Sequence, residues 1–286
     1  MGSSPSKAAR PSTADVKTVI IPIIPQDVID EILDHLATYS DFGSLRACAL
    51  VSKPWVPSCR SHLFRTAHFT SGSVSAWLET FPVPEESPAR HVRDLRIQIG
   101  GLDWVPRTFF ECIPWFTNAE SISLLGPEPG DVAQVRLPLP WSPPAQSVTS
   151  LTIETDMATL AEIRYFMGHL PNLDDLSLSG GHIYLDKSLL LGIGTTLRVK
   201  LGGKLVLRDV RHATKDDLTN MLLEIPTGLR FTEVEIQSTR VCLPSVVRLV
   251  EACSATLVKL SYTVSMPGKY HSFSLSSWLQ CAKYQD

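Results

Sequence analysis

Apolar and polar residues follow a helical period in the N-terminal part of the chain. Across residues 24–36 the apolar side chains recur every three or four positions, and acidic residues occupy the opposite side. Pro25 stands at the start of this pattern, where its missing N–H costs no hydrogen bond. A second helix is predicted over residues 44–51 and a third over residues 52–64, each beginning at a serine suited to an N-cap.

From about residue 90 the pattern changes to seven short runs of alternating apolar and polar residues, which is typical of strands. The central apolar residues of these runs are Leu95, Ile122, Leu151, Leu176, Leu205, Val234 and Leu260. Successive central residues are 27, 29, 25, 29, 29 and 26 positions apart. Three of the intervening segments have helical spacing, namely residues 157–170, 215–225 and 243–253.

A strand and a helix repeated at this interval fall in the range of leucine-rich repeats. A single unit of that kind cannot bury its own apolar side, so the units must stack. The sequence therefore predicts an α/β fold in which a curved, irregular solenoid carries a parallel sheet on its concave side. The asparagine that commonly follows each strand in such repeats is missing, and residues 126–146 are rich in proline, which predicts irregular turns and one extended loop. An unrelated α/β fold with evenly spaced strands is the alternative.

Residues 24–65 resemble the F-box, especially in the F-box proteins abundant in mushroom-forming fungi. The resemblance rests on the Ile24-Pro25 pair, the amphipathic first helix, the string L-R-x-C-x-L-V-x-x-x-W over residues 45–55, and the closing HLFR. Degenerate leucine-rich repeats often follow the F-box in these proteins. The implied organisation is a disordered tail (1–19), a small three-helix F-box (20–68), and a repeat domain of about seven strand units (69–286).

The resemblance implies that the chain is the substrate-recognition subunit of an SCF-type ubiquitin ligase. The F-box would dock on the Skp-type adaptor, and through it on cullin, while the repeats bind a target protein. The implied adaptor-binding residues are Ile24, Pro25, Val28, Ile29, Ile32, Leu45, Leu50, Val51 and Trp55. From the strand pattern, the candidate target-binding residues on the sheet are Arg96, Gln98, Thr152, Glu154, Ser177, Arg208 and Glu235. Their mixed charges indicate no single ligand type, and a plain solvated face fits them equally.

Charge and composition also bear on the partners and the cellular compartment of the protein. The net charge of −3 favours neither nucleic acid nor an anionic membrane, and the apolar run over residues 19–24 is too short for a membrane span. The six cysteines form no C-x-x-C pair and no secretory leader precedes them, which suggests reduced thiols in the cytoplasm or nucleus. Gly2 lies in a loose match to a myristoylation site, for which an ordinary polar tail is the simpler interpretation.

The sequence also bears on three other functions: catalysis, DNA binding and a scaffold role. Catalytic and nucleotide-binding motifs such as G-x-S-x-G, H-E-x-x-H and G-x-G-x-x-G are absent, so we expect no catalytic residues and no cofactor. The pair Cys59 and His62 lacks a second ligand pair at zinc spacing, so we expect no metal there. Residues 24–65 include five acidic and four basic residues. A DNA-binding unit needs an excess of basic side chains to contact the phosphates, so this composition disfavours DNA binding. A repeat scaffold that binds protein partners without joining a ligase remains the alternative.

Overall fold

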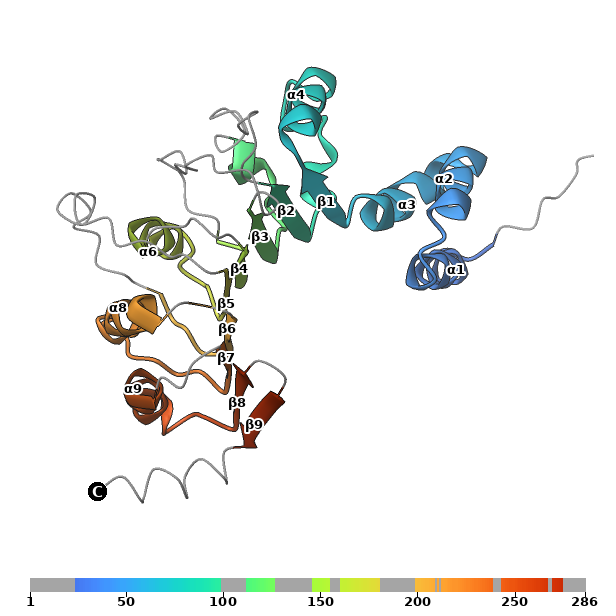
Figure 1. Ribbon diagram of the computed structural model, residues 1–286. Coiled ribbons are helices and arrows are strands. Elements are labelled where there is room, and N and C mark those ends of the chain that lie inside the picture. Colours follow the sequence, from blue (N-terminus) through green and yellow to red (C-terminus); the bar gives the residue numbers. More distant parts are fainter. Residues whose placement is uncertain are drawn as a thin grey trace, which may run out of the picture.

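The structure is a computed structural model that describes most of the chain as one helical region followed by one sheet (Figure 1). The predicted tail (1–19), Gly2 and most of the predicted loop over 126–146 lie outside the described residues. Those residues are 24–98, 112–126, 146–154, 160–180, 199–208, 210, 212–238, 243–266 and 269–274.

The helical region, which we term the three-helix unit, comprises α1 (Gln26–Thr38), α2 (Phe42–Val51), η1 (Lys53–Trp55) and α3 (Val56–Leu63). The predicted third helix is therefore a 3₁₀ turn followed by an α-helix, because Pro54 and Pro57 each fit only the first turn of a helix. The prediction of Ser44 as the N-cap of the second helix is wrong. The helix begins two residues earlier, and the Asp41 carboxylate accepts a hydrogen bond from the Ser44 N–H at 3.0 Å.

The described residues then form a nine-stranded sheet, with its strands in chain order from one edge to the other. The first eight strands are parallel, and the last one pairs antiparallel with β8. The strands are β1 (Thr66–Phe69), β2 (Asp94–Gln98), β3 (Ser121–Leu125), β4 (Ser150–Glu154), β5 (Asp175–Ser179), β6 (Lys204–Arg208), β7 (Glu233–Ser238), β8 (Lys259–Met266) and β9 (Lys269–Ser274). The sheet thus begins at Thr66, three residues before the predicted start of the repeat domain.

The pairing register confirms the strand spacing predicted from the sequence. All seven central residues, from Leu95 to Leu260, lie side by side across the sheet. Two strands were not predicted. In β1 the position that pairs with Leu95 is Ala67, which gives a weak apolar signal, and β9 turns back on β8 instead of continuing the parallel order.

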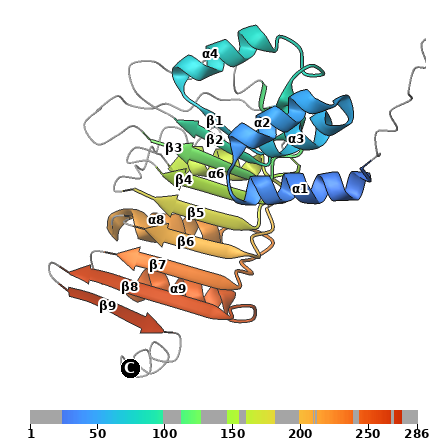
Figure 2. The same cartoon turned by 90° about the vertical axis from the view of Figure 1, so that its right-hand side faces the viewer.

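In the part of the chain that the structure describes, helices pack on one side of the curved sheet and none packs on the other, which we term the bare side (Figures 1 and 2). The three predicted helices are present as α6 (Leu160–Gly168), α8 (His212–Leu223) and α9 (Leu243–Cys253). The bounds of α9 match the prediction, whereas α8 begins and ends earlier than predicted. The same side also carries α4 (Ser71–Thr80), which was not predicted, and the connections contain two short 3₁₀ turns, η2 (Pro88–His91) and η3 (Ile113–Trp115). The bare side is the concave one, as the sequence predicted.

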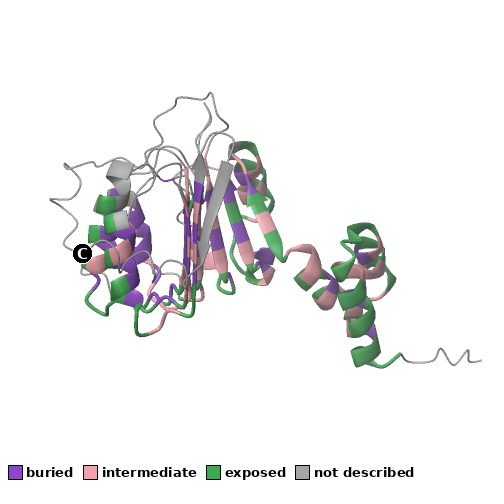
Figure 3. Cartoon of the chain, turned by 60° about the horizontal axis from the view of Figure 1, so that its bottom comes forward, coloured by how far each residue is buried: buried purple, intermediate pink, exposed green. Residues whose placement is uncertain are grey.

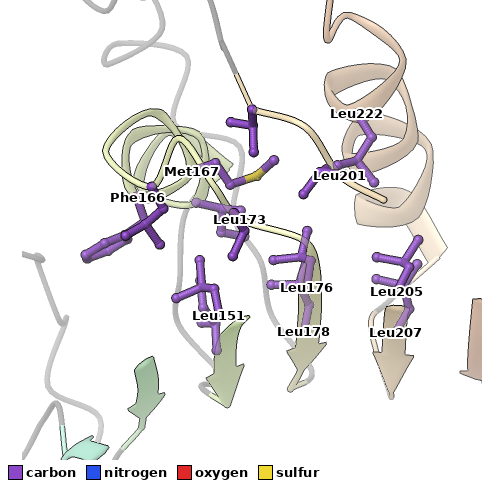
Figure 4. Packing of buried hydrophobic residues seen from close by; sticks show 14 of the residues in the cluster. Leu151, Phe166, Met167, Leu173, Leu176, Leu178, Leu201, Leu205, Leu207 and Leu222 are labelled. Carbon is purple, nitrogen blue, oxygen red and sulfur yellow. The ribbon is translucent and has the colours of Figure 1, made fainter. Parts of the chain in front are cut away.

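The main core lies between the sheet and these outer helices (Figure 3). In the central units Leu151, Leu176 and Leu205 point toward the helices and belong to the same buried cluster as Phe166 and Leu222 (Figure 4). All five of these residues are fully buried. The three-helix unit has a separate small core, so the two regions do not share one apolar interior.

Polar side chains link neighbouring units just before the strands begin. Asn118 donates to the backbone carbonyl of Arg90 at 2.6 Å, and Asn172 donates to that of Gln146 at 2.7 Å. Thr227 makes the equivalent bond to the carbonyl of Val199 at 2.6 Å. The sequence lacks the asparagine ladder that commonly follows the strands, whereas these contacts satisfy backbone carbonyls ahead of the strands, at their opposite ends.

Replacing Gly203 with alanine is expected to destabilise the sheet by about 1–2 kcal/mol. A β-carbon there would lie 2.1 Å from the Asp175 Oδ1 atom, which accepts a hydrogen bond from the Lys204 N–H. The carboxylate would have to move and that bond would be lost. Gly72→Ala in α4 is the matched control: its β-carbon would meet no atom within 4 Å, and alanine favours the helix, so no loss is expected. Chemical denaturation of both variants measures the difference, and equal stabilities would contradict the prediction.

Candidate protein-docking surfaces

The three-helix unit encloses a small core of four buried residues, Ile29, Leu33, Leu45 and Cys59. Trp55 is half-buried and packs against this core. The resemblance had placed Ile29, Leu45 and Trp55 on the adaptor-facing surface. In the structure Ile29 and Leu45 face inward, because three short helices can form a stable unit only if their innermost apolar side chains meet. These two residues hold the helices together and present no surface to a partner.

The other predicted docking residues are exposed, and we term them the apolar docking surface: Ile24, Pro25, Val28, Ile32, Leu50 and Val51. Ile24, Val28 and Ile32 are four residues apart along the first helix and the turn before it, so they lie on one side of it. Leu50 and Val51 end α2 and are the most exposed of the set, at 89% and 69%.

Exposure of large apolar side chains is concentrated in this region of the molecule. Among the described residues nine large hydrophobic side chains are exposed, and seven of them fall within residues 24–51. Tyr39 and Phe42 complete the seven and were not predicted. Phe42 is the first residue of α2 and Tyr39 directly follows α1. At such helix ends the helical spacing of apolar residues does not predict which side chains are exposed. Such a concentration on one small unit is typical of a surface that binds another protein.

Polar contacts fix the angle between the first and third helices. The Ser58 hydroxyl donates to the Asp30 carboxylate at 2.7 Å, and Gln26 donates to the same oxygen at 2.9 Å. These hydrogen bonds, with that from Ser58 the larger effect, hold the pKa of Asp30 below its ordinary value. His62 of α3 contacts Asp34 of α1, with 3.0 Å between Nε2 and Oδ1. The exposed residues of α1 are thereby held in a fixed position relative to α3.

Cys59 and His62, the candidate half of a metal site, serve different structural roles. The Cys59 side chain is fully buried in the helical core, where burial, with a smaller contribution from nearby Cys48, raises the pKa of its thiol. The His62 imidazole instead bonds to Asp34. Within the described residues no group of three or more potential metal ligands occurs.

The second surface is the bare face of the sheet, which Figure 2 shows toward the viewer. All seven candidate target-binding residues lie on this face, because each alternates with a core residue along its strand. The register aligns them in rows across the sheet. The middle row is His68, Arg96, Ser123, Thr152, Ser177, Val206, Glu235 and Ser261.

Charges on this face are unevenly distributed. Glu235 accepts from Arg208 at 2.8 Å and from Lys204 at 2.9 Å, and the next strand adds a pair between Lys259 and Glu233. The central strands β3–β5 instead carry small hydroxyl side chains in the first and third positions, apart from Asp175. Arg96 is exposed and forms no ion pair among the described residues. The face therefore offers hydrogen-bonding groups at its centre and a self-compensated ionic cluster toward its C-terminal edge.

We expect the ionic cluster to add a small, pH-dependent contribution to stability. Hydrogen bonds from Arg208 and then Lys204 lower the pKa of Glu235 below its ordinary value of 4.5. A lowered pKa means that the stabilisation is present above pH 4.5 and is lost as the pH falls through the pKa of the folded protein. The difference between wild type and Glu235→Gln, at most about 1 kcal/mol at pH 7, should therefore vanish at lower pH. Thermal melts across this range measure it. Glu251→Gln, at an exposed position of α9, is the control and should show no such difference.

Comparison with known proteins provides no relative: no family model, no curated protein and no solved structure matches the chain. Within the described residues no helix is both long enough and apolar enough to cross a membrane.

Proposed function

We propose that the protein is the substrate-recognition subunit of an SCF-type ubiquitin ligase. In this proposal the three-helix unit is an F-box that docks on the Skp-type adaptor, and the sheet belongs to degenerate leucine-rich repeats that bind the target. The supporting observation is the concentration of exposed apolar side chains on the three-helix unit, next to a large bare sheet face. The chain contributes proximity between a target and the ubiquitin-carrying enzyme, and performs no bond chemistry itself.

The connection between the two regions supports this role. Only Phe64 and Arg65 separate α3 from β1, and the Arg65 carbonyl accepts hydrogen bonds from the N–H groups of Arg93 and Asp94 at 2.7 and 3.0 Å. A short, hydrogen-bonded connection of this kind keeps the helical unit at a fixed position relative to the sheet. A target bound on the sheet would therefore be presented at a constant distance from the adaptor.

Co-expression with a Skp-type adaptor and a cullin tests the proposal directly. A stable ternary complex that survives size-exclusion chromatography is the expected result. Binding of the adaptor without cullin would favour the alternative, a repeat scaffold outside the ligase. Absence of adaptor binding would overturn the proposal.

A further inference from the structure

A hollow of about 480 Å³ lies where the three-helix unit meets the first strand of the sheet. Its walls come from the end of α1, the start of α2, the end of α3 and the residues that lead into β1. Its volume lies within the range of about 300–1,000 Å³ that is common for ligand sites in proteins. The apolar docking surface does not include any of its lining residues, so this is a separate site.

One part of the wall is apolar. Phe42, Leu63 and Ala37 line it, and Phe42 remains 46% exposed although it is a large aromatic side chain. Phe42 also lies outside the helical core, whose members are all at least half-buried. An exposed phenylalanine beside a partly buried leucine gives an apolar group of a ligand a surface on which to pack.

The polar part of the wall contains three charged or titratable side chains, two of which bond to each other. His62 is 16% exposed and contacts Asp34, so both already have a partner. The third, Arg65, is exposed, and its guanidinium has no hydrogen bond or ion pair among the described residues. Because the Arg65 carbonyl is held by two backbone N–H groups of the next unit, the base of this side chain is fixed beside the hollow. An unpaired guanidinium whose side chain starts beside the hollow favours a carboxylate as its partner.

The hollow also adjoins the bare face of the sheet. Thr66 lines it, and the Thr66 hydroxyl donates to Asp94 at 3.4 Å within the first row of that face. A protein lying across the sheet could therefore extend a short segment into the hollow without disturbing the helices.

We propose that this hollow binds a peptide segment of the target in which a large apolar side chain lies next to a carboxylate. The apolar side chain packs against Phe42 and Leu63, and the carboxylate pairs with Arg65. That the ligand is part of a protein rests on the proposed function, whereas the chemistry of the ligand rests on the hollow alone.

Selection of short random peptides displayed on phage, against the purified full chain, tests this proposal. We expect enrichment of peptides that contain leucine, isoleucine or phenylalanine beside aspartate or glutamate. A synthetic peptide of the enriched sequence should lose at least about tenfold in affinity toward Arg65→Gln and toward Phe42→Ala. Arg230→Gln, an exposed arginine in the connection that leads into β7, and Tyr39→Ala, an exposed aromatic residue outside the hollow, are the matched controls and should bind as wild type does.

Two outcomes would overturn the assignment: no enrichment over an unrelated bait, or enriched peptides that bind Arg65→Gln and Phe42→Ala as tightly as wild type. Both substituted side chains are exposed, so the variants should fold, and thermal melts establish this. The adaptor is absent from the selection. Failure here therefore leaves the ligase proposal standing, and failure of adaptor binding leaves the peptide result unchanged.

Discussion

The double substitution of Ile32→Glu and Leu50→Glu is expected to weaken adaptor binding at least about 100-fold, since two apolar contacts at the centre of an interface commonly contribute this much. Both side chains are exposed in the structure, at 43% and 89%. In the proposed complex each would lose contact with water, and a glutamate in its place would bury an unpaired charge. Isothermal titration of the purified chain with a Skp-type adaptor measures the change.

The design depends on leaving the fold intact. Exposed positions away from special contacts tolerate substitution within about 0.5 kcal/mol, so the double variant should melt close to wild type. Val258→Glu is the matched control, because Val258 is 76% exposed but lies just before β8, at the end of the sheet that is far from the three-helix unit (Figure 1). Unchanged adaptor affinity in the double variant would remove the apolar docking surface from the proposal.

Substitutions at Ile29, Leu45 or Trp55 would not provide this test. Charged residues at the first two positions would disrupt the core of the three-helix unit, and truncation of Trp55 would remove a side chain that packs on it. Loss of adaptor binding in such variants would follow from unfolding as readily as from a lost contact. The resemblance implied these positions and Ile32 and Leu50 alike, and the structure directs the test to Ile32 and Leu50 because both are exposed.

The distinction between Val28 and Ile29 shows why the sequence could not define the docking surface. Both are apolar and adjacent on the first helix, and the helical period places them on a single broad apolar side. Which residues on the apolar side of α1 are buried depends on where α2 and α3 pack across this helix. The tertiary structure decides this, and the helical period of α1 does not. Val28 remains exposed, whereas Ile29 meets Leu45 and Cys59 in the core.

The sheet was easier to predict from the sequence because the same strand pattern recurs in each unit. An inward leucine, isoleucine or valine recurs at nearly constant intervals, and the structure aligns all seven in register. Where the repeat weakens, prediction fails: β1 has Ala67 at that position, and β9 reverses direction. The hollow beside Arg65 lay beyond sequence reasoning, because four separate elements bring its walls together.

Truncation of Leu176 to alanine is expected to destabilise the sheet and its outer helices by about 2–5 kcal/mol. Leu176 lies in the fifth of nine strands and is fully buried, pointing at the outer helices (Figure 4). Units on both sides pack against this strand, so the surroundings cannot close over the cavity without shifting their own register. Urea denaturation followed by circular dichroism measures the loss.

Ser177→Ala is the matched control, because Ser177 is the next residue of the same strand and lies on the bare face. It tests whether any truncation in this strand lowers stability or only truncation in the core. The Ser177 side chain is directed away from the core, so its truncation should change stability by no more than about 0.5 kcal/mol. A similar loss in both variants would contradict the assignment of the two faces. Because the three-helix unit has its own core, Leu176→Ala should also leave adaptor binding intact at urea concentrations where the sheet still holds. Loss of both together would instead indicate that the short connection through Arg65 couples the unfolding of the two regions.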